Sequence, residues 1–151
     1  MRLTSAALGF LMLILAGAAA AHGLPVERVV IETRAGPRGF TMEIAADDAS
    51  RTQGLMHRLH LAKDAGMLFD FQRPVMTAFW MKDTPLPLDM LFVRADGTIS
   101  TVAANAVPYS TAEISSAEPI RAVIEIGGGQ ARAQGIAPGD RVRAVMFEIK
   151  R

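Results

Sequence analysis

The chain has 151 residues, with 16 Lys and Arg against 15 Asp and Glu, a formal net charge of +1, and 50% hydrophobic residues. This near-neutral balance gives no electrostatic reason to expect binding to nucleic acid or to an anionic membrane. The absence of Cys excludes disulfides, thiolate zinc sites, Cys nucleophiles and an acylated lipoprotein anchor.

The first 21 residues are typical of a secretory signal peptide. Arg2 supplies a positive start, Leu8 to Leu15 form a short apolar segment, and Gly17 to Ala21 supply small residues of the cleavage-site type. The apolar segment is short for a membrane-spanning helix, which needs about 20 residues. We therefore expect cleavage after Ala21 and export to the periplasm or beyond. Residues 22–151 should form a single domain that is not attached to the membrane after cleavage.

The first elements predicted in the mature sequence form a β-hairpin. Arg28 to Thr33 is rich in Val and Ile, and Ala35 to Gly39 is a turn that contains Gly and Pro. Phe40 to Ile44 then alternates apolar and polar residues, as a half-buried strand does.

A helix is predicted next, capped by Asp47 or Asp48 and ending near Leu59. Gly54 lies inside this range, and glycine in a helix interior costs about 1 kcal/mol relative to alanine. The glycine therefore indicates either a close packing contact or a break in the helix.

The rest of the chain predicts further short strands. They are residues 66–71, 77–81, 89–94, 98–104, 121–126 and 142–149, with a helical turn at 130–134. Thr84 to Pro87 contains two prolines and is predicted to be a rigid loop. Gly127 to Gly129 indicates a bend or a close backbone approach. Seven or eight short strands with one short helix predict a mainly β fold, a compact antiparallel barrel or sandwich.

Several ordered blocks of sequence resemble a known family. They are Arg51-x-x-Gly-Leu-Met-x-Arg58, Gly66-Met-Leu-Phe69, Phe79-Trp-Met-Lys-Asp-Thr84, Pro87-Leu-Asp-Met-Leu-Phe92, Asp96-Gly97, Val123-Ile-Glu125-Ile, Gly129 and Gly139-Asp140. In this order they closely resemble the DUF192 family, also called UPF0127, over nearly the whole mature chain. The resemblance implies a compact β-rich domain and supplies no activity. Where that family usually reads Trp-Met-Lys-Asn-Thr, this chain has Asp83, which replaces an amide by a carboxyl group.

Two carboxyl groups lie inside apolar runs and are the first candidates for a functional role. Asp89 and Glu125 each lie between two apolar residues of a predicted strand, so each needs a hydrogen bond, an ion pair or a shifted pKa. Arg51 and Arg58, on one stripe of the predicted helix, are their natural partners. The alternative is that these carboxyl groups brace the helix against the sheet or face solvent.

A ligand site near the loop of Trp80, the only Trp, is the functional interpretation. The expected ligand-binding residues are Arg58, Trp80, Asp83, Thr84, Asp89 and Glu125. Arg58 would hold an anionic or hydroxyl-rich group, and Trp80 would stack on the ligand. The protein would then be a non-catalytic binding or accessory module for a small polar molecule or a cell-envelope partner. It would need no cofactor and no metal.

A hydrolase stays open as a second function. Asp89 and Glu125 could act as an acid and a base beside Trp80 on a carbohydrate or cell-wall substrate, provided that the two carboxyl groups converge. The sequence contains no Gly-x-Ser-x-Gly motif that would supply a Ser nucleophile.

Copper binding stays open as a third function. The available thioethers and imidazoles belong to Met56, His57, His60, Met67, Met76 and Met81. Such soft ligands select Cu(I), and an exported protein could use them. Methionines that alternate with Leu and Phe are also typical of a hydrophobic core, so the pattern does not decide between the two roles.

Overall fold

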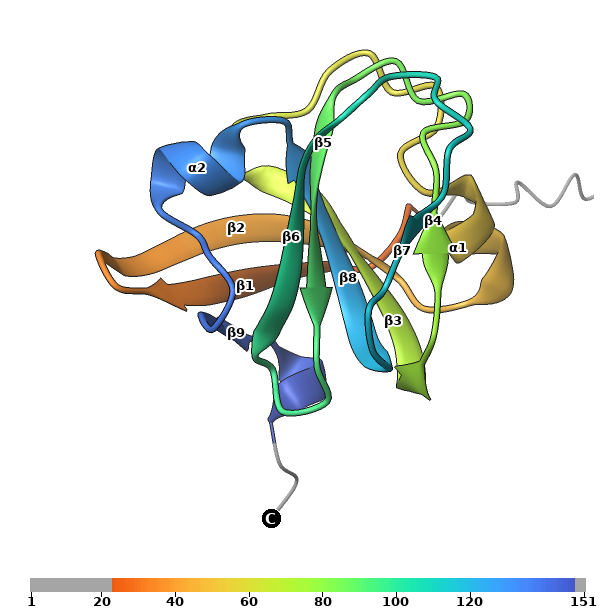
Figure 1. The fold of residues 1–151 in the computed structure, drawn as a ribbon. Helices are drawn as coiled ribbons and strands as arrows, with labels where there is room; N and C mark the ends of the chain where they lie inside the picture. Colours follow the sequence, from red (N-terminus) through yellow and green to blue (C-terminus); the bar gives the residue numbers. More distant parts are fainter. Residues whose placement is uncertain (1–22, 149–151) are drawn as a thin grey trace, which may run out of the picture.

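The structure is a computed structural model that describes residues 23–148 (Figure 1). The predicted signal peptide, residues 1–21, lies outside the described residues. No helix in the described part is long and apolar enough to cross a membrane. The elements in chain order are β1 Val26–Thr33, β2 Gly36–Ala45, α1 Asp48–Gln53, β3 Ala65–Val75, β4 Ala78–Phe79, β5 Leu88–Val93, β6 Ile99–Ala106, β7 Ile114–Ser115, β8 Ile120–Gly127, α2 Gln130–Gln134, β9 Arg141–Arg143 and the 3₁₀ helix η1 Val145–Phe147.

Seven strands form one curled sheet in the order β6-β5-β8-β3-β2-β1-β9. Only β2 and β3 pair in parallel; the other neighbours are antiparallel. The two ends of the sheet meet, because Val142 N donates to Gly97 O at 2.8 Å and Thr98 forms a bridge with Arg141. The sheet thus curls into a half-barrel whose edge strands touch only at these residues, and the mainly β fold expected from the sequence is confirmed.

Each face of the sheet carries its own hydrophobic core. One core takes side chains from the strands at both ends of the sheet, such as Ile99 of β6 and Val142 of β9, and so fills the inside of the curl. The other core contains Met67, Phe69, Met90 and Phe92 and lies beneath α1 and a two-stranded sheet of β4 and β7. Figure 1 shows α1, β4 and β7 together on this side of the molecule.

Several predicted boundaries were wrong, among them the end of β3, which was predicted at residue 71 and is observed at Val75. The helix ends at Gln53 instead of near Leu59, because Gly54 has a φ of +47° and a Cβ there would lie 3.3 Å from the Phe69 ring. Hence both expectations for this glycine are met, a close contact and a break. The strand predicted at 77–81 is only Ala78–Phe79, since the Met81 N–H turns to the carbonyl of Ser110.

The final strand was also wrong in its bounds, since it was predicted at 142–149 and is observed as Arg141–Arg143. Its pairing with β1 lasts for three residues, and the chain then enters η1, whose first N–H (Val145) donates to the carboxylate of Glu27 at 2.6 Å.

The Gly127 to Gly129 segment makes the close backbone approach that was predicted. Gly128 N donates to Pro87 O at 2.8 Å, and a Cβ at Gly128 would lie 2.9 Å from Pro87.

Candidate functional site

A pocket of about 410 Å³ lies on the side of the sheet covered by α1 and β4, a volume in the range of small-molecule sites. Part of its lining comes from α1 and the turn after it, and part comes from β4 and Trp80. The part that belongs to the sheet strands β3 and β8 is called the floor. The lining residues are Asp48, residues 51–56, Phe69, Phe71, residues 77–80, Thr84 and Glu125.

Aromatic rings make up much of the pocket wall. Phe79 meets Phe69 edge-to-face with ring centroids 5.0 Å apart, and it meets Phe71 in the same way at 6.3 Å. Phe69 and Phe71 share one face of β3 because alternate residues of a strand point the same way. Trp80 is 48% exposed, and the ammonium group of Lys82 lies 5.4 Å from its ring centre. The ring of Trp80 is therefore available to a ligand on one side of the pocket.

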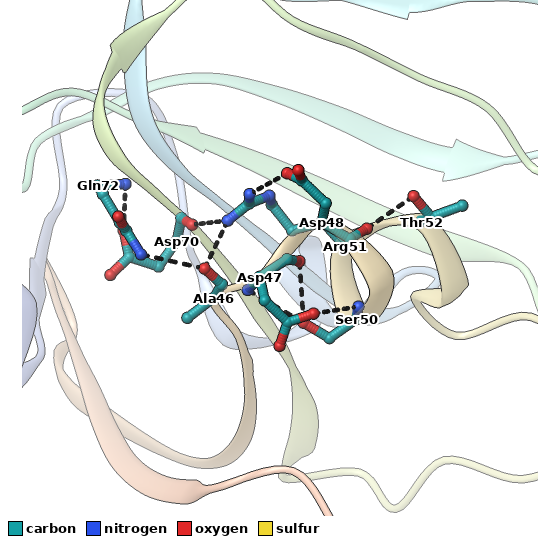
Figure 2. Close-up of polar contacts among 8 residues, drawn as sticks. All are labelled: Ala46, Asp47, Asp48, Ser50, Arg51, Thr52, Asp70 and Gln72. Atoms are coloured by element: carbon teal, nitrogen blue, oxygen red, sulfur yellow. Dashed lines mark hydrogen bonds and ion pairs between the residues drawn. The ribbon is translucent and has the colours of Figure 1, made fainter.

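Arg51 lines the pocket and holds α1 against the sheet through the polar contacts drawn in Figure 2. Its Nη1 donates to the backbone carbonyls of Ala46 and Asp70, each at 2.7 Å, and its Nη2 pairs with Asp48 at 2.6 Å. Its guanidinium carbon also lies 5.7 Å from the centre of the Phe71 ring. The helix is only six residues long, and Asp47 and Ser50 complete it with a reciprocal capping box. This small helix is thus tied down at its start and along its inner side.

Glu125 brings a buried carboxyl group to the floor of the pocket. On β8 it lies in register with Met67 of β3 and Met90 of β5, and it is 4% exposed. Within residues 23–148, no hydrogen bond to this carboxyl is found; because no fully enclosed side-chain oxygen in this part of the chain lacks a partner, the Glu125 oxygens keep some accessible surface, and Glu125 lines the pocket. Burial raises the pKa of Glu125 to about 8. At neutral pH the group is therefore mainly protonated and can both donate and accept a hydrogen bond.

Asp89 lies on the opposite face of the sheet from Glu125. It is in register with Ile126, so it shares the face of the inner core, whereas Glu125 shares the face of Met90. Its carboxylate accepts three backbone N–H groups, from Asn105 at 2.8 Å, Gly129 at 3.0 Å and Ala131 at 2.8 Å. Asp89 therefore braces the start of α2 against β6 and does not line the pocket.

The arginine partners expected for these two carboxyl groups are not observed. Arg58 lies beyond the end of α1 and binds Glu43 through two hydrogen bonds, Nη1 to Oε1 at 2.6 Å and Nη2 to Oε2 at 2.5 Å. Arg51 is engaged by Asp48 and two carbonyls. The shared stripe predicted for the two arginines required a helix to Leu59, and that helix ends earlier.

Two neighbouring residues from the predicted site have different placements. Thr84 is buried, lines the pocket, and donates its hydroxyl to the carbonyl of Lys82 at 3.1 Å. Asp83 does not line the pocket; it has a φ of +53°, and its carbonyl accepts the N–H of His57 at 2.8 Å. Asn and Asp both tolerate this left-handed backbone well, so the Asp at this position fits the turn.

Of the six predicted site residues, the structure therefore brings Trp80, Thr84 and Glu125 together, and places Arg58, Asp83 and Asp89 elsewhere. The sequence analysis missed the pocket roles of Phe69, Phe71 and Phe79. The Phe-x-Phe spacing on a predicted strand was a usable signal, because it places both rings on one face.

The arrangement needed for the hydrolase alternative is absent, since Asp89 and Glu125 lie on opposite faces of the sheet. For copper, Met67 and Met81 are fully buried core residues, while Met76 is 62% exposed, so these sulfurs do not converge at one accessible point. Within residues 23–148, no three His, Asp or Glu side chains are grouped to hold a metal ion.

A second hollow, of about 460 Å³, lies near η1 and is lined by Glu27, Asp70 and Arg121 among others. Three of its charged groups, Glu27, Asp70 and Arg121, have partners within the chain, and the fourth, Glu148, is exposed. Asp70 pairs with Arg121, and Glu27 accepts the N–H of Val145. Of these two hollows, the one with Glu125 offers a buried carboxyl group without a donor from the described residues.

Comparison with known proteins places the chain among uncharacterised relatives. A search of curated proteins found no match. A solved structure from Sinorhizobium meliloti 1021, provisionally described as a transcription regulator, is 45% identical, with a TM-score of 0.81 over 83% of this chain and 98% of that one. A protein of unknown function from Novosphingobium aromaticivorans DSM 12444 is 40% identical, with a TM-score of 0.80 over 83% of this chain and 89% of that one. Residues 29–144 match the model of the DUF192 family, described as "Uncharacterized ACR". The chain therefore belongs to the DUF192 family.

Proposed function

We propose that this protein is an exported, non-catalytic module that binds a small molecule in the pocket between α1 and β4. The observation that carries the proposal is the Glu125 carboxyl, 4% exposed, on the pocket floor without a donor from the described residues. Buried polar groups are normally hydrogen-bonded, and each exception calls for an explanation. A ligand group that hydrogen-bonds Glu125 is such an explanation.

The pocket lining defines what this ligand would look like. An apolar or aromatic body would pack against Phe71 and Phe79 and stack on Trp80 near the mouth. One polar group would reach the floor and bind Glu125. Binding without catalysis is favoured because the second carboxyl expected from the sequence, Asp89, lies on the other face of the sheet.

A thermal-shift screen of small aromatic and aliphatic compounds, followed by Trp80 fluorescence, tests the binding role. A ligand of the native state should stabilise it by about 2.7 kcal/mol at a hundredfold excess over its Kd. We expect Glu125→Gln and Trp80→Ala each to reduce the shift produced by the same compounds, while Glu113→Gln, at an exposed acid outside the pocket, leaves it unchanged. A flat screen, or hits that ignore both pocket variants, would contradict the proposal.

The export part of the proposal is supported by the pattern of residues 1–21 alone. Protein purified from its native cells should begin at His22 or within one or two residues of it, and should fractionate with the periplasm or the medium. N-terminal mass analysis of the fractionated protein checks this. A cytosolic protein that retains Leu8 to Leu15 would show that export is wrong.

A further inference from the structure

The charges in the pocket lining are unevenly compensated. Three lining residues carry a formal charge when ionised: Asp48 and Arg51 of α1, and Glu125 of β8. Asp48 and Arg51 pair with each other at 2.6 Å, and two backbone carbonyls also accept hydrogen bonds from Arg51. The in-register neighbours of Glu125 on β3 and β5 are Met67 and Met90, which do not titrate. Glu125 is thus the one lining group whose charge is left without a partner in the described residues.

Two of the aromatic rings that line the same pocket as Glu125 already lie close to cations of the chain. The guanidinium carbon of Arg51 lies 5.7 Å from the Phe71 ring centre, and Lys82 Nζ lies 5.4 Å from that of Trp80. Aromatic faces attract cations, and the attraction is larger where water is excluded. Inside the pocket, a cation would meet two attractive groups together: the aromatic rings of the wall and the unpaired carboxyl group of the floor.

We propose that the polar end of the ligand is a protonated amine, which lies against the aromatic wall and forms an ion pair with Glu125. This inference rests on the proposed binding function and names the class of ligand. A carboxylate ligand could accept the proton that Glu125 holds, but its negative charge would gain nothing from the aromatic faces, which attract cations. A hydroxyl would gain only a neutral hydrogen bond, roughly half as strong as a charge-assisted one. An ammonium group also supplies the positive charge that the buried carboxylate lacks.

Binding of an amine then moves one proton and makes no covalent bond. At neutral pH the free protein holds Glu125 mainly as the acid, and the amine is mainly ammonium. When the ion pair forms, Glu125 releases its proton to solvent and the ammonium keeps its own. Affinity should therefore rise with pH, by about tenfold per pH unit below the pKa of Glu125, as long as the amine stays protonated.

Three compounds with the same ring and different polar ends test the inference: benzylamine, benzyl alcohol and benzoate. Their binding to the purified protein would be followed by Trp80 fluorescence and by NMR shifts of the Trp80 and Thr84 amides between about pH 6 and about pH 8. We expect benzylamine to bind most tightly and to gain more than about tenfold in affinity over this range. Calorimetry at pH 7 in two buffers of different ionisation enthalpy should detect nearly one proton released.

Glu125→Gln should remove both the pH dependence and the proton release, whereas Glu113→Gln should retain them. If benzyl alcohol or benzoate binds at least as tightly as benzylamine, the amine assignment is overturned while the binding function stands. Failure of benzylamine to bind at millimolar concentration also overturns it. If all three compounds and the wider screen give no response, the binding function fails as well.

Discussion

Glu125→Gln is expected to abolish a loss of stability that the natural protein undergoes as the pH rises from about 4.5 to about 8. Burial raises the pKa of this carboxyl from 4.5 in a free chain to about 8 in the fold. Below pH 4.5 both the folded and the unfolded states hold the proton, so the group has no effect. Between the two values the unfolded state releases the proton and the folded state keeps it, so rising pH favours unfolding.

The natural protein should therefore lose about 3 kcal/mol in free energy of unfolding relative to Glu125→Gln between pH 4.5 and pH 7. Urea unfolding of both proteins at several pH values measures this difference, and effects of the other acids cancel in it. Glu113→Gln serves as the control for the loss of one acid and should run parallel to the natural protein. A constant difference between Glu125→Gln and the natural protein at every pH would show that Glu125 is not buried as an acid.

Asp89→Ala is expected to cost at least about 3 kcal/mol in free energy of unfolding, because three backbone N–H groups lose their acceptor at a site of 0% exposure. The damage should be local first, with faster amide exchange at Asn105, Gly129 and Ala131. Asp89→Asn keeps one acceptor oxygen and places an amide NH₂ against the remaining donors. We therefore expect its free energy of unfolding to lie between those of the natural protein and Asp89→Ala.

Chemical unfolding combined with hydrogen exchange distinguishes the structural role of Asp89, as an acceptor of backbone hydrogen bonds, from a role in ligand binding. Asp96→Asn is the matched control, since Asp96 accepts one N–H, from Thr98, in an exposed turn, and it should cost about 1 kcal/mol or less. Because Asp89 lies outside the pocket, ligand affinity should persist in any Asp89 variant that stays folded. A large loss of affinity at unchanged stability would return Asp89 to the binding site.

The sequence predicted most strands because apolar alternation and Gly- or Pro-containing turns are local signals. β1, β2, β5, β6 and β8 lie within a few residues of their predicted positions. Local signals were weaker where a contact distant in the sequence decides the structure. α1 stops where Gly54 meets the Phe69 ring, and β4 exists through pairing with β7, whose two residues carry no strand pattern of their own.

The site was predicted in part for the same reason. Trp80 was identified as the only Trp of the chain and Glu125 as a charge inside an apolar run, and both line the pocket. Asp89 had the same local signature as Glu125 and plays a different role. Which face each residue takes depends on the register between β5 and β8, and no local pattern reveals that register.

The most direct test of this account is the titration of the Glu125 side-chain carboxyl, followed by carbon-13 NMR in the free protein and with benzylamine. The account predicts a midpoint near 8 in the free protein and a clearly lower midpoint when the amine is bound, because the ion pair favours the carboxylate. A free-protein midpoint at the ordinary value for glutamate would mean that the carboxyl is solvated or already paired. That result would contradict the role of Glu125 as the unpartnered group at the floor of a ligand pocket.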